Sequence, residues 1–166
     1  EHSTTMDIDL AGFCTGIVEK NEVIDGSLIR KGDKIVGLPS SGLHSNGYSV
    51  INQLIRQNKL SVTKDLLTPT TIYTKQIEEL LKEIPIVGMA HITGGGIEEN
   101  ISRVIPKGLK AHIDWNSWNL PEIFTRVMLA GEIPPEEMKK IFNLGIGYVL
   151  IVPSEVEMDN IIGYIV

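Results

Sequence analysis

Apolar residues recur along the chain with two spacings, which predict interleaved strands and helices. Runs of consecutive or alternating apolar residues are typical of strands and occur over residues 11–19, 34–38, 86–92, 109–115, 147–152 and 161–166. Apolar residues at helical spacing predict helices over residues 48–60, 72–83, 97–104, 121–130 and 135–142. The elements alternate irregularly, without a strict strand–helix–strand rhythm. We therefore expect an α+β domain, in which helices cover one mixed β-sheet of five or six strands.

The polar segment after the second predicted strand connects a buried strand to a helix. Pro39 ends the strand over residues 34–38, and a glycine-containing loop over residues 40–47 follows it. Ser45 lies where the N-cap of the next helix is expected, since a serine hydroxyl can accept a hydrogen bond from an unpaired helical N–H group. The loop therefore leads directly into a helix N-terminus.

Composition narrows the class of protein. The 166 residues suffice for one domain with its own core. A content of 42% hydrophobic and 22% charged residues excludes a disordered chain and a coiled coil. No apolar run approaches the ~20 residues that a membrane span needs, so we expect no membrane association. Cys14 is the single cysteine, which excludes a disulfide framework and suits a reducing cytosol. We therefore expect a cytoplasmic protein with Cys14 in its core.

The charge balance bears on the kind of ligand. Fifteen Lys and Arg residues against 21 Asp and Glu residues give a net charge of −6, which argues against a general nucleic-acid binder. A small anion can still bind, because exposed charges are screened beyond ~8 Å at physiological salt. A charge-assisted hydrogen bond contributes roughly 1.5–3 kcal/mol. The features to seek are therefore loops that direct several N–H groups at one point.

Two segments have this design. Each follows a predicted buried strand and precedes a predicted helix: SSGLHSNGYS, residues 40–49, and HITGGGIEEN, residues 91–100. Helix N-termini present unpaired N–H groups and partial positive charge, so anions bind there. Glycines allow a close approach of the backbone. His44 and His91 can transfer a proton near neutral pH. Together the two loops predict a site for a phosphorylated small molecule.

Each feature has a structural interpretation as well. Three consecutive glycines often form a helix cap or tight turn, and a histidine in a loop is more often a hydrogen-bonding strut than a catalyst. For the other candidates the structural interpretation prevails: we expect His112 to be structural or at the surface, and Trp115 and Trp118 to pack. Residues 142–147 are expected to let a helix turn into a buried strand, and a contact with the site is the less favoured interpretation.

Several motifs together resemble one enzyme family. SSGLHSNGYS, HITGGG and FNLGIG resemble the phosphoribosylformylglycinamidine cyclo-ligases, which are also called aminoimidazole ribonucleotide synthetases. DLAGF, KGDKIVGL, TPTTIY and WNLPEIF are similar to the family as well, so the resemblance extends over residues 9–152. The resemblance is to the C-terminal domain, residues 9–166, with residues 1–8 as the remnant of an interdomain segment. The N-terminal domain of the family would be absent.

The resemblance implies an ATP-dependent ligase of de novo purine biosynthesis. The family closes formylglycinamidine ribonucleotide into aminoimidazole ribonucleotide and releases ADP and phosphate. Its N-terminal domain holds most of the ATP and Mg²⁺ site and forms the homodimer, so we expect no metal ligands here and an inactive isolated fragment. This chain contains no GxxxxGK[ST] phosphate loop, in agreement with that division.

The resemblance also assigns roles to the two loops. His44 and His91 are the expected catalytic residues. The expected substrate- and phosphate-binding residues are Ser40, Ser41, Gly42, Ser45, Asn46, Gly47, Thr93, Gly94, Gly95, Gly96 and Asn100. Among them, Asn100 is expected to fix its loop from the helix that follows. The alternatives are another ATP-dependent kinase or synthetase of the same superfamily, such as thiamine-phosphate kinase or selenophosphate synthetase, and a non-catalytic module that binds a phosphorylated metabolite.

Overall fold

A computed structural model describes residues 12–166. Within them a five-stranded sheet has the order β2-β4-β1-β5-β3, and every neighbouring pair is antiparallel. The α+β class is confirmed, but the sheet is antiparallel where a mixed sheet was expected. The strands are β1 (Lys34–Pro39), β2 (Gly88–His91), β3 (Ala111–Ile113), β4 (Ile146–Val152) and β5 (Ile161–Ile165).

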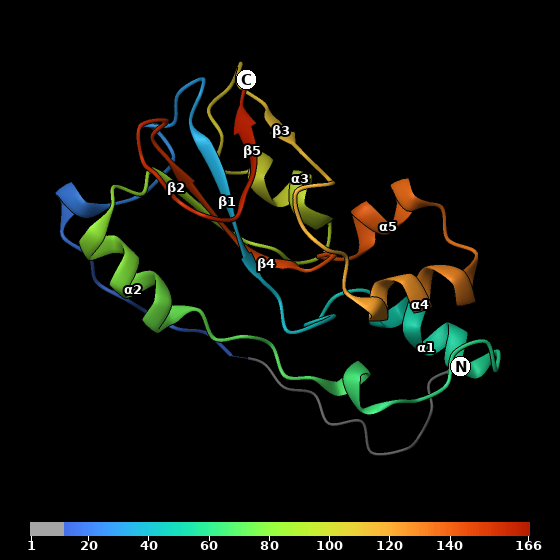
Figure 1. Cartoon of the computed structure of the whole chain (residues 1–166). Helices are drawn as coiled ribbons and strands as arrows, with labels where there is room; N and C mark the ends of the chain where they lie inside the picture. Colours follow the sequence, from blue (N-terminus) through green and yellow to red (C-terminus); the bar gives the residue numbers. More distant parts are fainter. Residues whose placement is uncertain (1–11) are drawn as a thin grey trace.

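The five predicted helices are present, with boundaries that differ by a few residues. Figure 1 shows α1, α4 and α5 gathered beyond one end of the sheet. Within residues 12–166 no helix is long and apolar enough to cross a bilayer. The helices are α1 (Tyr48–Arg56), α2 (Thr74–Glu83), α3 (Gly96–Ser102), α4 (Glu122–Gly131) and α5 (Pro135–Ile141), with short 3₁₀ turns η1 (Lys20–Glu22) and η2 (Lys64–Leu67).

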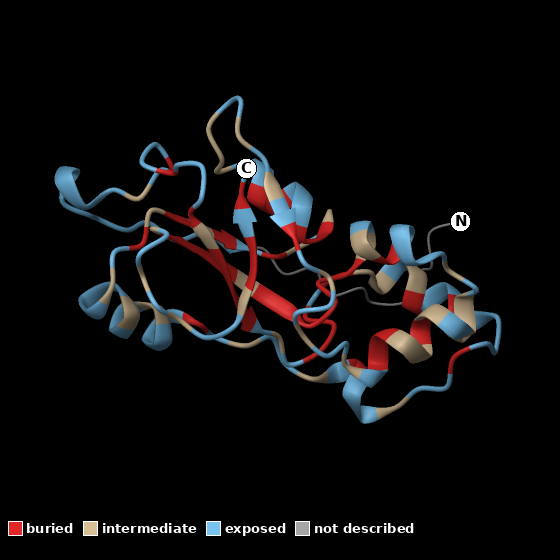
Figure 2. Ribbon diagram, turned by 45° about the horizontal axis from the view of Figure 1, so that its top comes forward, coloured by how far each residue is buried: buried red, intermediate tan, exposed pale blue. Residues whose placement is uncertain are grey.

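The sheet is buried on both faces. Side chains of β4 alternate between two core clusters: Val149 and Ile151 pack with α3, whereas Leu150 and Val152 pack on the side of α2. A third cluster joins α1, α4 and α5 and includes Phe124. Figure 2 shows the buried sheet between the exposed outer surfaces of the helices. The continuous apolar pattern of β4 follows from this two-sided burial.

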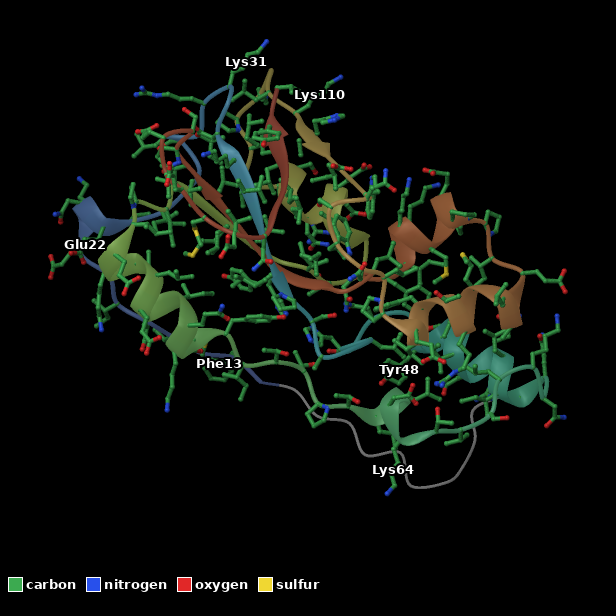
Figure 3. All side chains as sticks on the ribbon, viewed as in Figure 1. Phe13, Glu22, Lys31, Tyr48, Lys64 and Lys110 are labelled. Atoms are coloured by element: carbon green, nitrogen blue, oxygen red, sulfur yellow. The ribbon has the colours of Figure 1, made fainter. Side chains whose placement is uncertain are left out.

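The first predicted strand is wrong where the structure describes it. Residues 12–19 pair with no strand, and the side chains of Phe13 and Ile17 are 99% and 101% exposed (Phe13 is labelled in Figure 3). Cys14 is exposed as well, so its assignment to the core is also wrong. A strand needs a hydrogen-bonding neighbour, and residues 12–166 supply none for this segment. The expected interdomain remnant, residues 1–8, lies outside the described residues.

Candidate functional site

The topology brings the two glycine-containing segments to one end of the sheet. Strands β1 and β2 both lie antiparallel to β4, one on each side of it, so they run in the same direction. Pro39 at the end of β1 lies opposite Ile146, and His91 at the end of β2 lies opposite Tyr148. The loops that follow, residues 40–47 (the first loop) and residues 92–95 (the second loop), therefore meet where β4 begins.

Side chains connect the two loops directly. The Asn46 side-chain amide donates a hydrogen bond of 3.3 Å to the carbonyl of Ile92. The ring centroids of His44 and His91 lie 6.5 Å apart. The prediction that both segments belong to one site is therefore supported by their placement. Asn46 itself is buried and joins the loops, so its amide is already engaged within the protein.

Both serines that open the first loop are also engaged internally. The backbone N–H of Ser40 donates to the carbonyl of Gly145 over 2.8 Å, and its hydroxyl lies 3.0 Å from the carbonyl of Gly42. The Ser41 hydroxyl donates to the carbonyl of Pro69 over 2.6 Å. We expected these serines to supply donors to a ligand, whereas in the structure they fix the loop. Ser45 remains exposed.

Asn143 holds the same loop from a distance of about 100 residues along the chain. Its buried side-chain amide donates to the carbonyls of Gly42 and Leu43, over 2.9 and 3.2 Å. Its oxygen accepts the N–H of Gly145 at 2.9 Å and lies 2.9 Å from the Ser40 hydroxyl. For residues 142–147 a turning role was favoured over a contact with the site. The structure shows that this segment does contact the first loop.

Two glycines permit this close fit. A Cβ at Gly47 would lie 2.1 Å from the ring of Phe142, and Gly47 has φ of 71° as the N-cap of α1. This corrects the expectation that Ser45 is the N-cap, because only glycine accepts both the contact and the conformation without strain. A Cβ at Gly147 would lie 2.1 Å from the Tyr73 hydroxyl and 2.4 Å from the His44 ring.

The His44 imidazole is buried at the centre of this arrangement. Its Nε2 accepts the backbone N–H groups of Ser41 and Thr71, at 3.2 and 3.4 Å. Two donors at Nε2 place the proton of the neutral ring on Nδ1. Nδ1 is buried and has no partner among the described residues. Burial, followed by the nearby His91, lowers the pKa of His44, so the ring is neutral at pH 7 and acts as a strut.

His91, by contrast, is exposed and belongs to an aromatic group. Its ring stacks on Tyr148 with centroids 5.8 Å apart and an interplanar angle of 21°. The ring centroids of Tyr73 and Tyr148 lie 5.4 Å apart. Burial raises the pKa of both tyrosine hydroxyls, which therefore stay protonated at neutral pH. Sequence analysis did not find these tyrosines. A cavity of about 380 Å³ opens here, lined by Thr71, Ile72, Tyr73, Thr74, Ile77, Glu78, His91 and Tyr148.

The first loop retains free backbone donors. Within residues 12–166, the N–H groups of residues 42–45 and of Gly47 have no protein acceptor. Residues 42–44 are buried, and a buried N–H without a partner is costly. Helix α1, which follows, has no acidic residue in its first turn. This cluster of donors beside a helix N-terminus suits an anion.

The second loop uses its glycines differently. The N–H of Gly95 donates to the carbonyl of Lys140 over 3.0 Å, and that of Gly96 donates to Thr93 over 3.2 Å. A Cβ at Gly96 would lie 1.7 Å from the Lys139 carbonyl, so glycine is needed for packing against α5. We expected both N–H groups to face a ligand, but protein carbonyls occupy them. Among the described residues, Thr93 and Gly94 keep N–H groups without a protein acceptor.

Asn100 fixes the second loop, as the sequence predicted. Its side-chain amide donates to the carbonyls of Gly96 and Gly94, over 2.7 and 3.3 Å, and its oxygen accepts the Thr93 hydroxyl at 3.0 Å. Like Asn143, Asn100 binds backbone carbonyls of its loop through its side-chain amide, so these carbonyls point into the protein. Of the remaining predictions, His112 is exposed, and Trp115 and Trp118 pack with centroids 5.5 Å apart. No group of three potential metal ligands occurs in the described part of the chain.

The structure thus defines an α+β domain in which two loops, flanking one strand, meet at the end of an antiparallel sheet. Residues 30–162 match the family described as "AIR synthase related protein, C-terminal domain", and the chain belongs to this family. The resemblance inferred from the motifs is confirmed.

Three curated relatives of this chain are named phosphoribosylformylglycinamidine cyclo-ligase. The relative from Geotalea daltonii is 49% identical over an alignment that covers 93% of this chain and 47% of the relative. The relative from Lawsonia intracellularis is 48% identical, with coverage of 92% and 47%. The relative from a Thermoanaerobacter species is 50% identical, with coverage of 90% and 48%. The chain therefore spans about half the length of the curated relatives it matches.

Proposed function

We propose that this chain is the C-terminal half of an ATP-dependent cyclo-ligase of purine biosynthesis. The reaction converts formylglycinamidine ribonucleotide and ATP into aminoimidazole ribonucleotide, ADP and phosphate. The names of relatives near 50% identity support this proposal. The structural observation that carries it is the cluster of free backbone N–H groups in the first loop. In the same loop, the ring of His44 lies 6.5 Å, centroid to centroid, from the exposed His91 beside the cavity.

The first loop is proposed to bind a phosphate group of the ribonucleotide or of the reacting centre. Gly42, Leu43, His44, Ser45 and Gly47 supply the backbone N–H groups, and Thr93 and Gly94 supply two more from the second loop. Each charge-assisted hydrogen bond contributes roughly 1.5–3 kcal/mol, so three or four outweigh the weak repulsion from a net charge of −6. Fixed donors also stabilise charge that develops on a transferred phosphoryl group.

His91 is the histidine that we propose for contact with the substrate. The reaction transfers the ATP phosphoryl group to the formyl amide oxygen; the amidine nitrogen then attacks the formyl carbon, phosphate leaves, and the nitrogen loses a proton. An exposed imidazole at the cavity can accept that proton. His44 is assigned to holding the loop, because Nε2 is occupied by two backbone N–H groups.

The other half of the enzyme is proposed to supply what this chain lacks. The described residues contain no group of three carboxylate, histidine or cysteine side chains that could hold Mg²⁺. ATP and Mg²⁺ would be held mostly by an N-terminal domain, which would also form the homodimer, with residues 1–8 connecting the two. As a purine-biosynthesis enzyme the complete protein would work in the cytoplasm.

Two measurements test the proposal. Calorimetric titration of formylglycinamidine ribonucleotide into this chain should show saturable binding, whereas the unphosphorylated ribonucleoside should bind at least about tenfold more weakly because it lacks the charge-assisted contacts. The complete enzyme should consume ATP only when the ribonucleotide is present. Equal affinity for both compounds would contradict the assignment of the loop to a phosphate. Binding without turnover by the complete enzyme would favour the non-catalytic module.

A further inference from the structure

The side chain of Asn143 uses its whole hydrogen-bonding capacity on the first loop and its neighbours. A side-chain amide has two N–H donors and an oxygen that accepts two hydrogen bonds. In Asn143 the donors reach the carbonyls of Gly42 and Leu43, and the oxygen is shared by Gly145 N–H and the Ser40 hydroxyl. The residue is fully buried, so each of these bonds is costly to lose.

The direction of the two carbonyls determines the direction of the next two N–H groups. In a planar trans peptide the C=O of one residue and the N–H of the following residue point to opposite sides. Because the carbonyls of Gly42 and Leu43 point at Asn143, the N–H groups of Leu43 and His44 point away from it. Both N–H groups lack an acceptor within the described chain. Successive N–H groups on one side form the concave arrangement that binds anions.

We propose that Asn143 is a positioning residue that directs the N–H groups of Leu43 and His44 toward the bound phosphate. This role rests on the proposed function of the first loop. Phe142 and Gly145 support it from the same segment: the ring of Phe142 fills the space left by Gly47, and the carbonyl of Gly145 accepts the N–H of Ser40. The segment after α5 thus determines the conformation of the first loop through these contacts.

Asn143→Asp is the sharpest test, because the side chain keeps its shape and loses both donors. At pH 7.5 the ionised carboxylate would face two carbonyl oxygens, so the peptides would rotate and the two N–H groups would lose their direction. We expect the Kd for formylglycinamidine ribonucleotide to rise at least about tenfold. The ratio of the variant's Kd to the wild-type Kd should decrease toward pH 5, because a protonated carboxyl group can again donate a hydrogen bond to one of the two carbonyls.

Amide hydrogen exchange provides a readout that needs no ligand. The N–H groups of Leu43 and His44 should exchange faster in the folded variant than in wild type, while those of β4 change little. If Asn143→Asp does not fold, Asn143→Ser keeps one hydroxyl donor and should give an intermediate change in both measurements. Ile165→Ala is the matched control: it removes a buried side chain in β5, lowers the melting temperature and leaves the Kd unchanged.

The outcomes separate this proposal from the proposed function. A folded Asn143→Asp protein with the wild-type Kd and wild-type exchange at Leu43 and His44 would overturn the positioning role. If wild type does not bind the ribonucleotide, the proposed function fails, and the exchange rates still decide whether Asn143 orders the loop. A loss of affinity in Ile165→Ala equal to that in Asn143→Asp would also overturn the proposal, because instability alone would then explain both.

Discussion

The two loops look alike in sequence, but they differ in which side chain holds them and in how many of their N–H groups are engaged within the protein. The second loop is held by its own helix through Asn100, and protein carbonyls occupy the N–H groups of Gly95 and Gly96. The first loop is held from another part of the chain through Asn143, and most of its N–H groups stay free. Backbone donors remain available to a ligand only where something else fixes the carbonyls. The glycine triplet, which was expected to bind phosphate together with the first loop, mainly serves packing and internal hydrogen bonding.

Helix electrostatics point the same way. Helix α1 follows the first loop with nine residues and no acid in its first turn. Helix α3 follows the second loop with seven residues and carries Glu98 and Glu99 in its first turn. These carboxylates compete with any anion for the helix N-terminus. The first loop is therefore the stronger candidate for the main phosphate contact. In the proposed site, the second loop would contribute the N–H groups of Thr93 and Gly94.

The largest effect should come from the exposed histidine beside the cavity. In the complete enzyme, His91→Ala should lower kcat by about 10²- to 10⁴-fold, which is the usual contribution of an acid–base group. His112→Ala is the matched control, since His112 is also exposed on an edge strand and lies on β3, at the other side of the sheet. Unchanged kcat in His91→Ala would remove this histidine from the mechanism.

Substitutions of glycine should separate packing from binding within the second loop. Gly96→Val should cost about 3 kcal/mol or more of unfolding free energy, because φ is 69° and the added Cβ would overlap the Lys139 carbonyl. Gly94→Ala should change stability by less than about 0.5 kcal/mol, since nothing lies within 4 Å of the added atom. Chemical denaturation measures both. Similar costs at the two positions would contradict the packing role of Gly96.

The two buried asparagines should differ in what they affect. Asn100→Ala should destabilise the chain by about 1–3 kcal/mol, because several loop carbonyls lose their donor. Its Kd for formylglycinamidine ribonucleotide should rise less than that of Asn143→Asp, since the second loop offers fewer free N–H groups. Thermal unfolding and calorimetry on the same samples compare them. A greater loss of affinity in Asn100→Ala would reverse the ranking of the loops.

The smallest predicted effect is a dependence of stability on pH. The pKa of His44 is lowered in the folded state by burial and by His91. The unfolded chain therefore binds more protons than the folded one just below the ordinary pKa of about 6.5. The stabilisation that comes from a neutral His44 ring is complete above that pH. It is lost as the pH falls toward the pKa of His44 in the folded state, which is the lower of the two. His44→Gln should unfold with a flatter dependence between pH 7 and pH 5. An equal slope in both proteins would exclude His44 as the cause.

The sequence predicted most of the fold, because local periodicity determines most of these elements. The strand over residues 12–19 was wrong, since a strand also depends on a neighbour that spacing cannot reveal. Tyr148 was missed because only the register of β2 against β4 places it opposite His91. Tyr73, at the start of α2, was missed because only tertiary packing brings its ring to His91 and Tyr148.

The two segments that the sequence singled out lie together in the structure, but most of the hydrogen bonds that hold them were not predicted. Asn100 lies a few residues from the loop it fixes, so its role could be predicted locally. Asn143 acts on residues about 100 positions earlier, and a single sequence gives no pairing information at that range. One signal was available: a polar residue between a helix and a fully buried strand is buried too, so its hydrogen-bonding groups need partners nearby.

The most direct measurement is a titration of the ¹⁵N-labelled chain with formylglycinamidine ribonucleotide, observed at backbone amides. The amide resonances of Leu43 and His44 should shift progressively to saturation, while those of Gly95 and Gly96, already bonded to protein carbonyls, should stay near their starting positions. Shifts confined to Gly95 and Gly96, with Leu43 and His44 unmoved at saturation, would contradict the assignment of the phosphate to the first loop.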